Sequence, residues 1–120
     1  MKKLKFRKWN KNGKCWITFG GVNYWFENGI LNIVDSDILI YEQYTGLKDK
    51  NGKEIYEGDI VYDIYTGDEV FIVGWDNDKA SFMLADTAGY PMAYFDEFEL
   101  DKDLEVIGNV HENPELIGGK

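Results

Sequence analysis

The sequence holds few residues that could form a catalytic centre. Its 120 residues include one cysteine, Cys15, and one histidine, His111. A structural zinc site needs several such ligands, and catalysis by a thiol needs a base beside it. Cys15 and His111 lie near opposite ends of the chain, and Cys15 falls within a predicted strand. Because free cysteines are usually buried, we expect Cys15 to be a small apolar filler of the interior.

The carboxylates form no recognised metal motif. Counted from Asp49 or from Asp76, the acidic turns lack the glycine at position six that an EF-hand calcium loop requires. No lysine follows an acid two positions later, as a restriction-type nuclease would have it, and no phosphate-binding glycine loop occurs. Acidic turns such as Asp76–Asp78 are therefore expected to be solvated. The residues predict a protein that is not an enzyme and binds no metal or cofactor.

The distribution of charge is the main sign of a binding surface. There are 22 acids and 13 bases, which give a formal net charge of −9. Residues 1–14 hold seven bases and no acid, whereas the rest holds six bases and 22 acids, a formal charge of −16. Cations interleaved with aromatic rings can bind single-stranded nucleic acid. The acidic remainder would repel phosphates, so we favour a basic segment that lies on the acidic body or is solvated.

Two groups of residues are candidates for a binding surface. Alternation in the first basic segment places Lys5, Arg7 and Trp9 on one face, with Phe6 and Lys8 on the other. The first candidate group is Lys5, Arg7 and Trp9. The second group comes from the polar segment that follows residue 46, and its members are Lys48, Asp49, Tyr56 and Asp59.

Short strands and turns must position these residues. Asn28-Gly29 separates two hydrophobic runs and predicts a tight hairpin, because both residues tolerate positive φ. Residues 38–44 favour a long strand over a short helix, given their β-branched and aromatic content. Short strands at close spacing predict a small barrel or sandwich. The expected strands are 5–9, 15–19, 24–26, 30–34, 38–44, 58–65, 69–75, 80–85 and 105–110.

The remaining segments are less regular. Residues 45–58 are predicted to be a polar connection with a turn at Asn51-Gly52. Residues 92–104 are compatible with either a strand or a helical turn. Asn113-Pro114-Glu115 predicts a short helix, because these residues suit the N-cap, the first position and the positive end of the dipole.

A hydrophobic core and a cytoplasmic location are also expected. Each buried core side chain contributes roughly 1.5–3 kcal/mol to folding. No apolar run of about 18 residues could span a bilayer, and no export signal follows the basic segment. With an unpaired cysteine, this indicates the cytoplasm and no membrane partner. The predicted core residues are Phe6, Trp16, Ile17, Phe26, Ile33, Ile60, Val73 and Val106.

Three blocks of the sequence resemble the YopX family of phage and prophage proteins. The strongest is 44–61, Tyr-Thr-Gly-Leu-Lys-Asp-Lys-Asn-Gly-Lys-Glu-Ile-Tyr-Glu-Gly-Asp-Ile-Val. Residues 5–9 are similar to the opening segment of the family, and residues 106–116 are similar to its closing segment. Two positions depart from the pattern: Asn10 replaces an expected aspartate, and His111 replaces an expected aromatic residue.

The resemblance implies a mainly β, antiparallel protein of phage or prophage origin in a bacterial host. We predict an N-terminal β sub-domain, 1–44, packed on a small SH3-like barrel, 45–120, with a short C-terminal helical turn. The family brings no established activity. Because such barrels offer aromatic grooves and strand edges, we predict a non-enzymatic module that binds a host or phage protein or forms a homo-oligomer. The alternative is a nucleic-acid-binding protein that uses the basic aromatic N-terminus.

Overall fold

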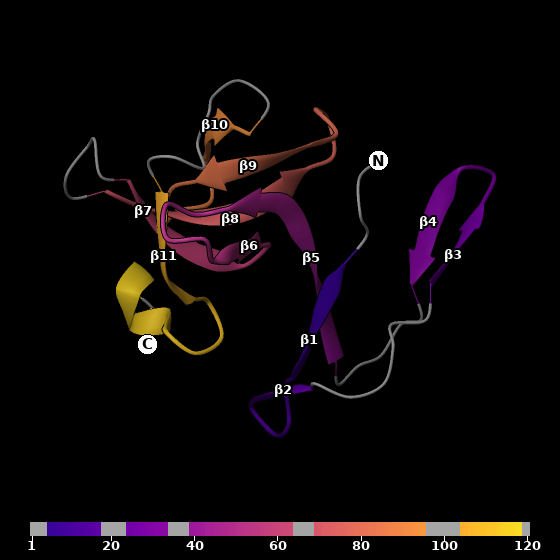
Figure 1. Ribbon diagram of the computed structural model, residues 1–120, viewed down its shortest axis with the longest axis horizontal. Coiled ribbons are helices and arrows are strands. Elements are labelled where there is room, and N and C mark those ends of the chain that lie inside the picture. The colour runs from indigo at the N-terminus through magenta and orange to yellow at the C-terminus, as the bar shows by residue number, and fades with distance from the viewer. Residues whose placement is uncertain (1–4, 18–23, 34–38, 64–68, 96–103, 119–120) are drawn as a thin grey trace.

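The computed structural model describes residues 5–17, 24–33, 39–63, 69–95 and 104–118 (Figure 1). These residues form short strands and one 3₁₀ helix, which confirms the predicted mainly β fold. The elements are β1 (Phe6–Asn10), β2 (Cys15–Ile17), β3 (Tyr24–Glu27), β4 (Ile30–Ile33), β5 (Leu39–Lys48), β6 (Glu54–Tyr56), β7 (Asp59–Asp63), β8 (Val70–Asp76), β9 (Ser81–Ala85), β10 (Pro91–Tyr94), β11 (Leu104–Asn109) and η2 (Pro114–Ile117).

Two antiparallel sheets and one hairpin make up the described structure. One sheet has the order β2-β1-β5-β6, and the other, with the order β10-β9-β8-β7-β11, curls into a half-barrel (Figure 1). The long strand β5 pairs with β1 through its first half and with β6 through its second half. The predicted sub-domain boundary at residue 44 therefore lies inside β5, a strand shared by the N-terminal segment and the rest of the sheet.

The hairpin β3–β4 confirms the strongest turn signal in the sequence. Asn28 and Gly29 both adopt positive φ, 53° and 78°. These angles match a two-residue turn whose twist fits the flanking strands. Tyr24 pairs with Ile33 at the open end of the hairpin, and Glu27 pairs with Ile30 beside the turn.

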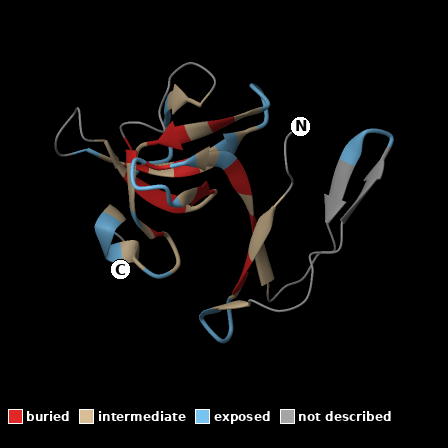
Figure 2. Ribbon diagram, in the orientation of Figure 1, coloured by how far each residue is buried: buried red, intermediate tan, exposed pale blue. Residues whose placement is uncertain are grey.

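The core lies inside the curled sheet, where Figure 2 shows buried positions gathered. Its buried members come mainly from β6, β7, β8, β9 and β11. Of the predicted core residues, Ile60 and Val73 are fully buried, which confirms them. Four others are only half-buried: Phe6 in β1, Trp16 and Ile17 in the edge strand β2, and Val106, which packs against the core from β11. The side chains of Phe26 and Ile33 lie outside the described structure.

Three local predictions need correction. Cys15 is exposed rather than buried, because it begins the edge strand β2, which pairs only with β1 in the sheet. The two faces predicted for β1 do not differ in burial as a solvated and a buried face would, since neighbouring Lys8 and Trp9 are both buried. Residues 45–58 are not simply a connection, because β5 continues through Lys48 and β6 follows.

The structure describes only part of the segment 92–104, for which the sequence allowed either a strand or a helical turn. Pro91–Tyr94 is strand β10, whereas 96–103 lie outside the described residues. The predicted helix forms as η2, with Pro114 in its first turn. Asn113 takes the N-cap position without a side-chain cap. Its Oδ1 instead accepts the backbone N–H of Asn109 at 3.2 Å, which closes the turn before the helix.

Candidate functional site

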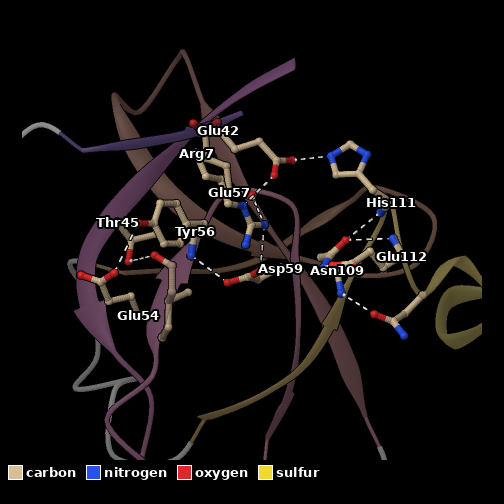
Figure 3. A network of polar contacts seen from close by, with 12 residues as sticks. Arg7, Glu42, Thr45, Glu54, Tyr56, Glu57, Asp59, Asn109, His111 and Glu112 are labelled. Carbon is tan, nitrogen blue, oxygen red and sulfur yellow. Dashed lines mark hydrogen bonds and ion pairs between the residues drawn. The ribbon is translucent and has the colours of Figure 1, made fainter. Parts of the chain in front are cut away.

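Four of the seven predicted surface residues meet in one interior cluster. Strand β1 supplies Arg7 and Trp9, and the β6–β7 region supplies Tyr56 and Asp59. Figure 3 shows Arg7 and Asp59 pointing toward one another. These four residues are joined by others from β2, β5 and the segment after β11. We define the Arg7 cluster as Arg7, Trp9, Trp16, Glu42, Tyr56, Asp59 and His111.

Arg7 holds two buried carboxylates at once. Its Nε lies 2.9 Å from Glu42 Oε1, and its Nη2 lies 2.8 Å from Asp59 Oδ1. The same Nη2 donates to the carbonyl oxygen of Glu57 at 3.1 Å. The carboxylate side chains are only 8% and 3% exposed, and that of Arg7 is 20% exposed. A planar guanidinium with several donors suits this arrangement in a way that a lysine ammonium does not.

Aromatic rings enclose the guanidinium of Arg7. Its Cζ lies 4.4 Å from the ring centre of Trp16 and 4.8 Å from that of Tyr56. Rings on a guanidinium attract the cation and keep water from it. The cation is therefore fixed from several directions and faces the interior of the protein.

Burial disfavours the charged forms of two acids beside Arg7. Burial raises the pKa of Asp59, although Arg7 and the backbone N–H of Tyr56 act against this rise. The same N–H donates to Asp59 Oδ2 at 2.8 Å. Burial also raises the pKa of Glu57, whose Oε1 accepts the backbone N–H of Gln43. The charged form of these acids thus depends on the donors around them.

His111 connects the C-terminal segment to β1. Its ring stacks on Trp9 with 5.0 Å between centres and 13° between planes, and its Nε2 lies 3.0 Å from Glu42 Oε2. Trp16 Nε1 donates to Glu112 Oε1 at 2.7 Å. Where the family pattern led us to expect an aromatic residue, His111 keeps a flat ring for stacking and adds a nitrogen for Glu42.

The sequence interpretation missed Glu42 as the partner of Arg7, and His111 as the partner of Glu42. A signal was present for Glu42, a charged residue that directly follows the apolar and aromatic run Ile38-Leu39-Ile40-Tyr41. A charge in such a strand needs a partner if it is buried. No comparable signal existed for His111, because its stacking on Trp9 depends on the fold.

Lys5 and Lys48 lie outside the cluster. Lys5 Nζ is 2.8 Å from Glu54 Oε1, and both side chains are partly exposed. Their hydrogen bond raises the pKa of Lys5 and lowers that of Glu54. Lys48 is exposed and faces Glu54 in the β5–β6 ladder. Of these two predicted surface lysines, Lys5 already has a carboxylate partner within the chain.

Asp49 is buried and organises a turn. Its Oδ1 accepts the backbone N–H groups of Asn51 and Lys53, and its Oδ2 accepts that of Val106, each at 2.9 Å. Burial alone raises the pKa of Asp49, but the three N–H donors together bring it below the ordinary value. This carboxylate fixes the β5–β6 connection to β11.

Asp49→Asn should lower the free energy of unfolding by about 2–3 kcal/mol at neutral pH, because an amide NH₂ would face a backbone N–H. Asp49 stabilises the fold above its unfolded pKa, and this contribution disappears as the pH falls through its lower folded pKa. Urea unfolding at several pH values measures both effects.

Asp86→Asn is the matched control, since only Oδ1 of Asp86 accepts the backbone N–H groups of Ala88 and Tyr90. Equal losses in the two variants would contradict this role of Asp49.

An open groove lies apart from the Arg7 cluster, and the sequence interpretation did not identify it. The groove has a volume of about 300 Å³. Trp75 in its wall is 41% exposed, and the edge of that ring contacts the buried Phe82, with 5.0 Å between ring centres. Residues from β5, from the β8–β9 hairpin and from the end of β10 line it: Thr45, Leu47, Trp75, Ala80, Ser81, Phe82 and Phe95.

The part of the chain that the structure describes contains no group of three or more His, Cys, Asp or Glu residues that could hold a metal ion. Among the same residues, no helix is long and apolar enough to cross a membrane.

Comparison with known proteins agrees with the resemblance in the sequence. A sequence model of the YopX protein family matches residues 5–118. The crystal structure of protein EF1440 from Enterococcus faecalis is similar at a TM-score of 0.59 and 25% identity, over 96% of this chain and 98% of that chain. No curated protein matches the chain. The family match spans the three segments that meet in the Arg7 cluster, and the chain belongs to the YopX family.

Proposed function

We propose that this YopX-family protein is a non-catalytic module that binds another protein. The observation that carries this proposal is the groove beside Trp75, a large aromatic side chain of β8 that remains 41% exposed. Concave sites with a few aromatic side chains are the usual places for ligands to bind. On the family resemblance, we place its action in the cytoplasm of a bacterium that carries phage or prophage DNA.

The ion pairs of β1 support protein binding over nucleic-acid binding. Lys5 and Arg7 are paired with acids of the same chain, and Lys8 is buried. Phosphate contacts would have to displace these partners at a cost in free energy. In the basic segment, among the described residues, Lys11 and Lys14 are exposed, in the turn between β1 and β2. Among the residues of this segment that the structure describes, nucleic-acid binding would therefore rest mainly on that turn.

Selection from an unbiased display library of twelve-residue peptides tests the proposal. We expect enriched peptides whose binding shifts the backbone amide resonances of groove residues such as Thr45, Leu47 and Ser81. Recovery of no binding peptide would count against a peptide-binding module. Salt-sensitive binding of a single-stranded oligonucleotide that is lost in Lys11→Ala/Lys14→Ala would support the nucleic-acid alternative instead. Sedimentation of the free chain reports whether it forms a homo-oligomer.

A further inference from the structure

The wall of the groove carries an aromatic ring that is both accessible and fixed. Trp75 is 41% exposed, and its Nε1 donates to Asn77 Oδ1 at 2.8 Å. Phe82 supports the ring from the side at an interplanar angle of 75°. A ring held in this way loses little conformational freedom when a ligand binds on it.

The extended strand β5 also lines the groove, through Thr45 and Leu47. Thr45 Oγ1 donates to the carbonyl oxygen of Ile55 at 2.8 Å and accepts the backbone N–H of Leu47 at 3.2 Å. The hydroxyl of Thr45 is thus engaged within the protein. An extended segment lying along β5 would bind mainly through contacts with Leu47 and the aromatic side chains, because these are the large apolar groups that line the groove.

The sheet that carries Trp75 is acidic. Residues 69–95, which include β8, β9 and β10, contain four acids and one base. Asp76 ends β8, and Asp78 lies with Lys79 in the turn that follows, so these three residues together carry a formal charge of −1. The hydroxyl of Tyr94 donates to Asp76 Oδ2 at 2.7 Å, and this bond lowers the pKa of Asp76. A cation that approaches the ring therefore also approaches negative charge, whereas an acidic ligand would be repelled.

We infer that the groove takes an extended basic segment of a partner protein, with an arginine or lysine placed over the indole of Trp75. The inference rests on the proposed function and names the chemical class of its partner. The ring attracts the cation, and the net negative charge of Asp76, Asp78 and Lys79 adds a second attraction. The chain's net charge of −9 favours the approach of a basic partner over that of an acidic one.

Selection of the same peptide library against wild-type protein, with counter-selection against Trp75→Ala, tests this inference. We expect the remaining peptides to contain more arginine and lysine than the starting library. The most enriched peptide is then synthesised with citrulline in place of each arginine, or with acetyl-lysine in place of each lysine. Because a cation on an aromatic ring contributes about 0.5–2 kcal/mol, removal of the charge should weaken binding about 2–30-fold.

Matched variants separate the loss of the ring from the loss of the fold. Trp75→Phe keeps an aromatic ring and should retain most of the binding, whereas Trp75→Ala should lose it. Tyr90→Ala removes an exposed aromatic side chain outside the groove lining and should bind like the wild type. Thermal unfolding of each variant confirms that it is folded at the temperature of the binding assay.

The outcomes distinguish this inference from the proposed function. Peptides that bind wild-type protein and Trp75→Ala equally, or that carry no excess of basic residues, would overturn the inference and leave a protein-binding module. A library that yields no binder against wild-type protein would overturn both.

Discussion

Arg7→Ala should lower the free energy of unfolding by about 3–5 kcal/mol, the usual cost of leaving a buried charge without its partner. The variant keeps Glu42 and Asp59 in the interior and removes the cation that lies 2.9 Å and 2.8 Å from them. It also removes the group between the rings of Trp16 and Tyr56. Chemical unfolding followed by tryptophan fluorescence measures the loss.

The loss in Arg7→Ala should depend on pH in a defined direction. Burial raises the pKa of Asp59 even beside Arg7, and removal of the guanidinium should raise it further. A carboxyl whose pKa is higher in the folded state favours folding at low pH, and this advantage is lost as the pH rises through the folded pKa. The deficit relative to the wild type should therefore be smaller at about pH 5 than at about pH 7.5.

Two substitutions control the Arg7 experiment. Lys11→Ala removes an exposed cation from the turn after β1 and should change stability by no more than about 0.5 kcal/mol. Arg7→Lys keeps the charge but cannot reproduce the planar set of donors, so it should recover only part of the loss. Full recovery with lysine would show that the charge alone, and not the geometry, stabilises the cluster.

Gly58→Ala should lower the free energy of unfolding by about 2–5 kcal/mol, the sum of a backbone cost and an overpacking cost. Gly58 has a φ of +83°, which disfavours any residue with a Cβ. A Cβ at this position would also collide with the carboxylate of Glu42, the group that Arg7 and His111 both contact. Either the backbone or the carboxylate must move. Arg7 and His111 hold the carboxylate, and hydrogen bonds with the backbone of Val73 and Val110 hold the backbone of Gly58.

Gly52→Ala separates the two costs of the Gly58 substitution. Gly52 has nearly the same φ, +84°, but no atom lies within 4 Å of a Cβ built on it. It should therefore lose only the backbone cost of about 1–2 kcal/mol. The difference between the two variants in urea unfolding measures the collision with Glu42. Equal losses would show that Glu42 moves aside freely, which the burial of this carboxylate argues against.

The Arg7 cluster suggests why three separated blocks of the sequence share a family pattern. Residues 5–9 supply Arg7 and Trp9, residues 44–61 supply Tyr56 and Asp59, and residues 106–116 supply His111. The fold brings these blocks together around one cation. These residues contact one another and stabilise the fold, whereas the groove beside Trp75 lies elsewhere.

Local patterns determined the strands and turns. Alternation identified most of the strands, and Asn28-Gly29 identified a hairpin whose two turn residues have the positive φ that the pair tolerates. Such features depend on a few neighbouring residues, so they can be predicted from the sequence. Cys15 was wrongly predicted to be buried because an edge strand has the same local pattern as an inner strand.

The sequence by itself determined the mainly β fold, the family and the polarity between a basic start and an acidic remainder. Only the tertiary structure decided what this polarity does among the described residues: it pairs Lys5 with Glu54, and Arg7 with Glu42 and Asp59. These partners lie 35 to 52 positions apart in the numbering, so no local pattern connects them. The physical reason is that pairing and burial depend on which strands become neighbours, and only the folded chain specifies these neighbours.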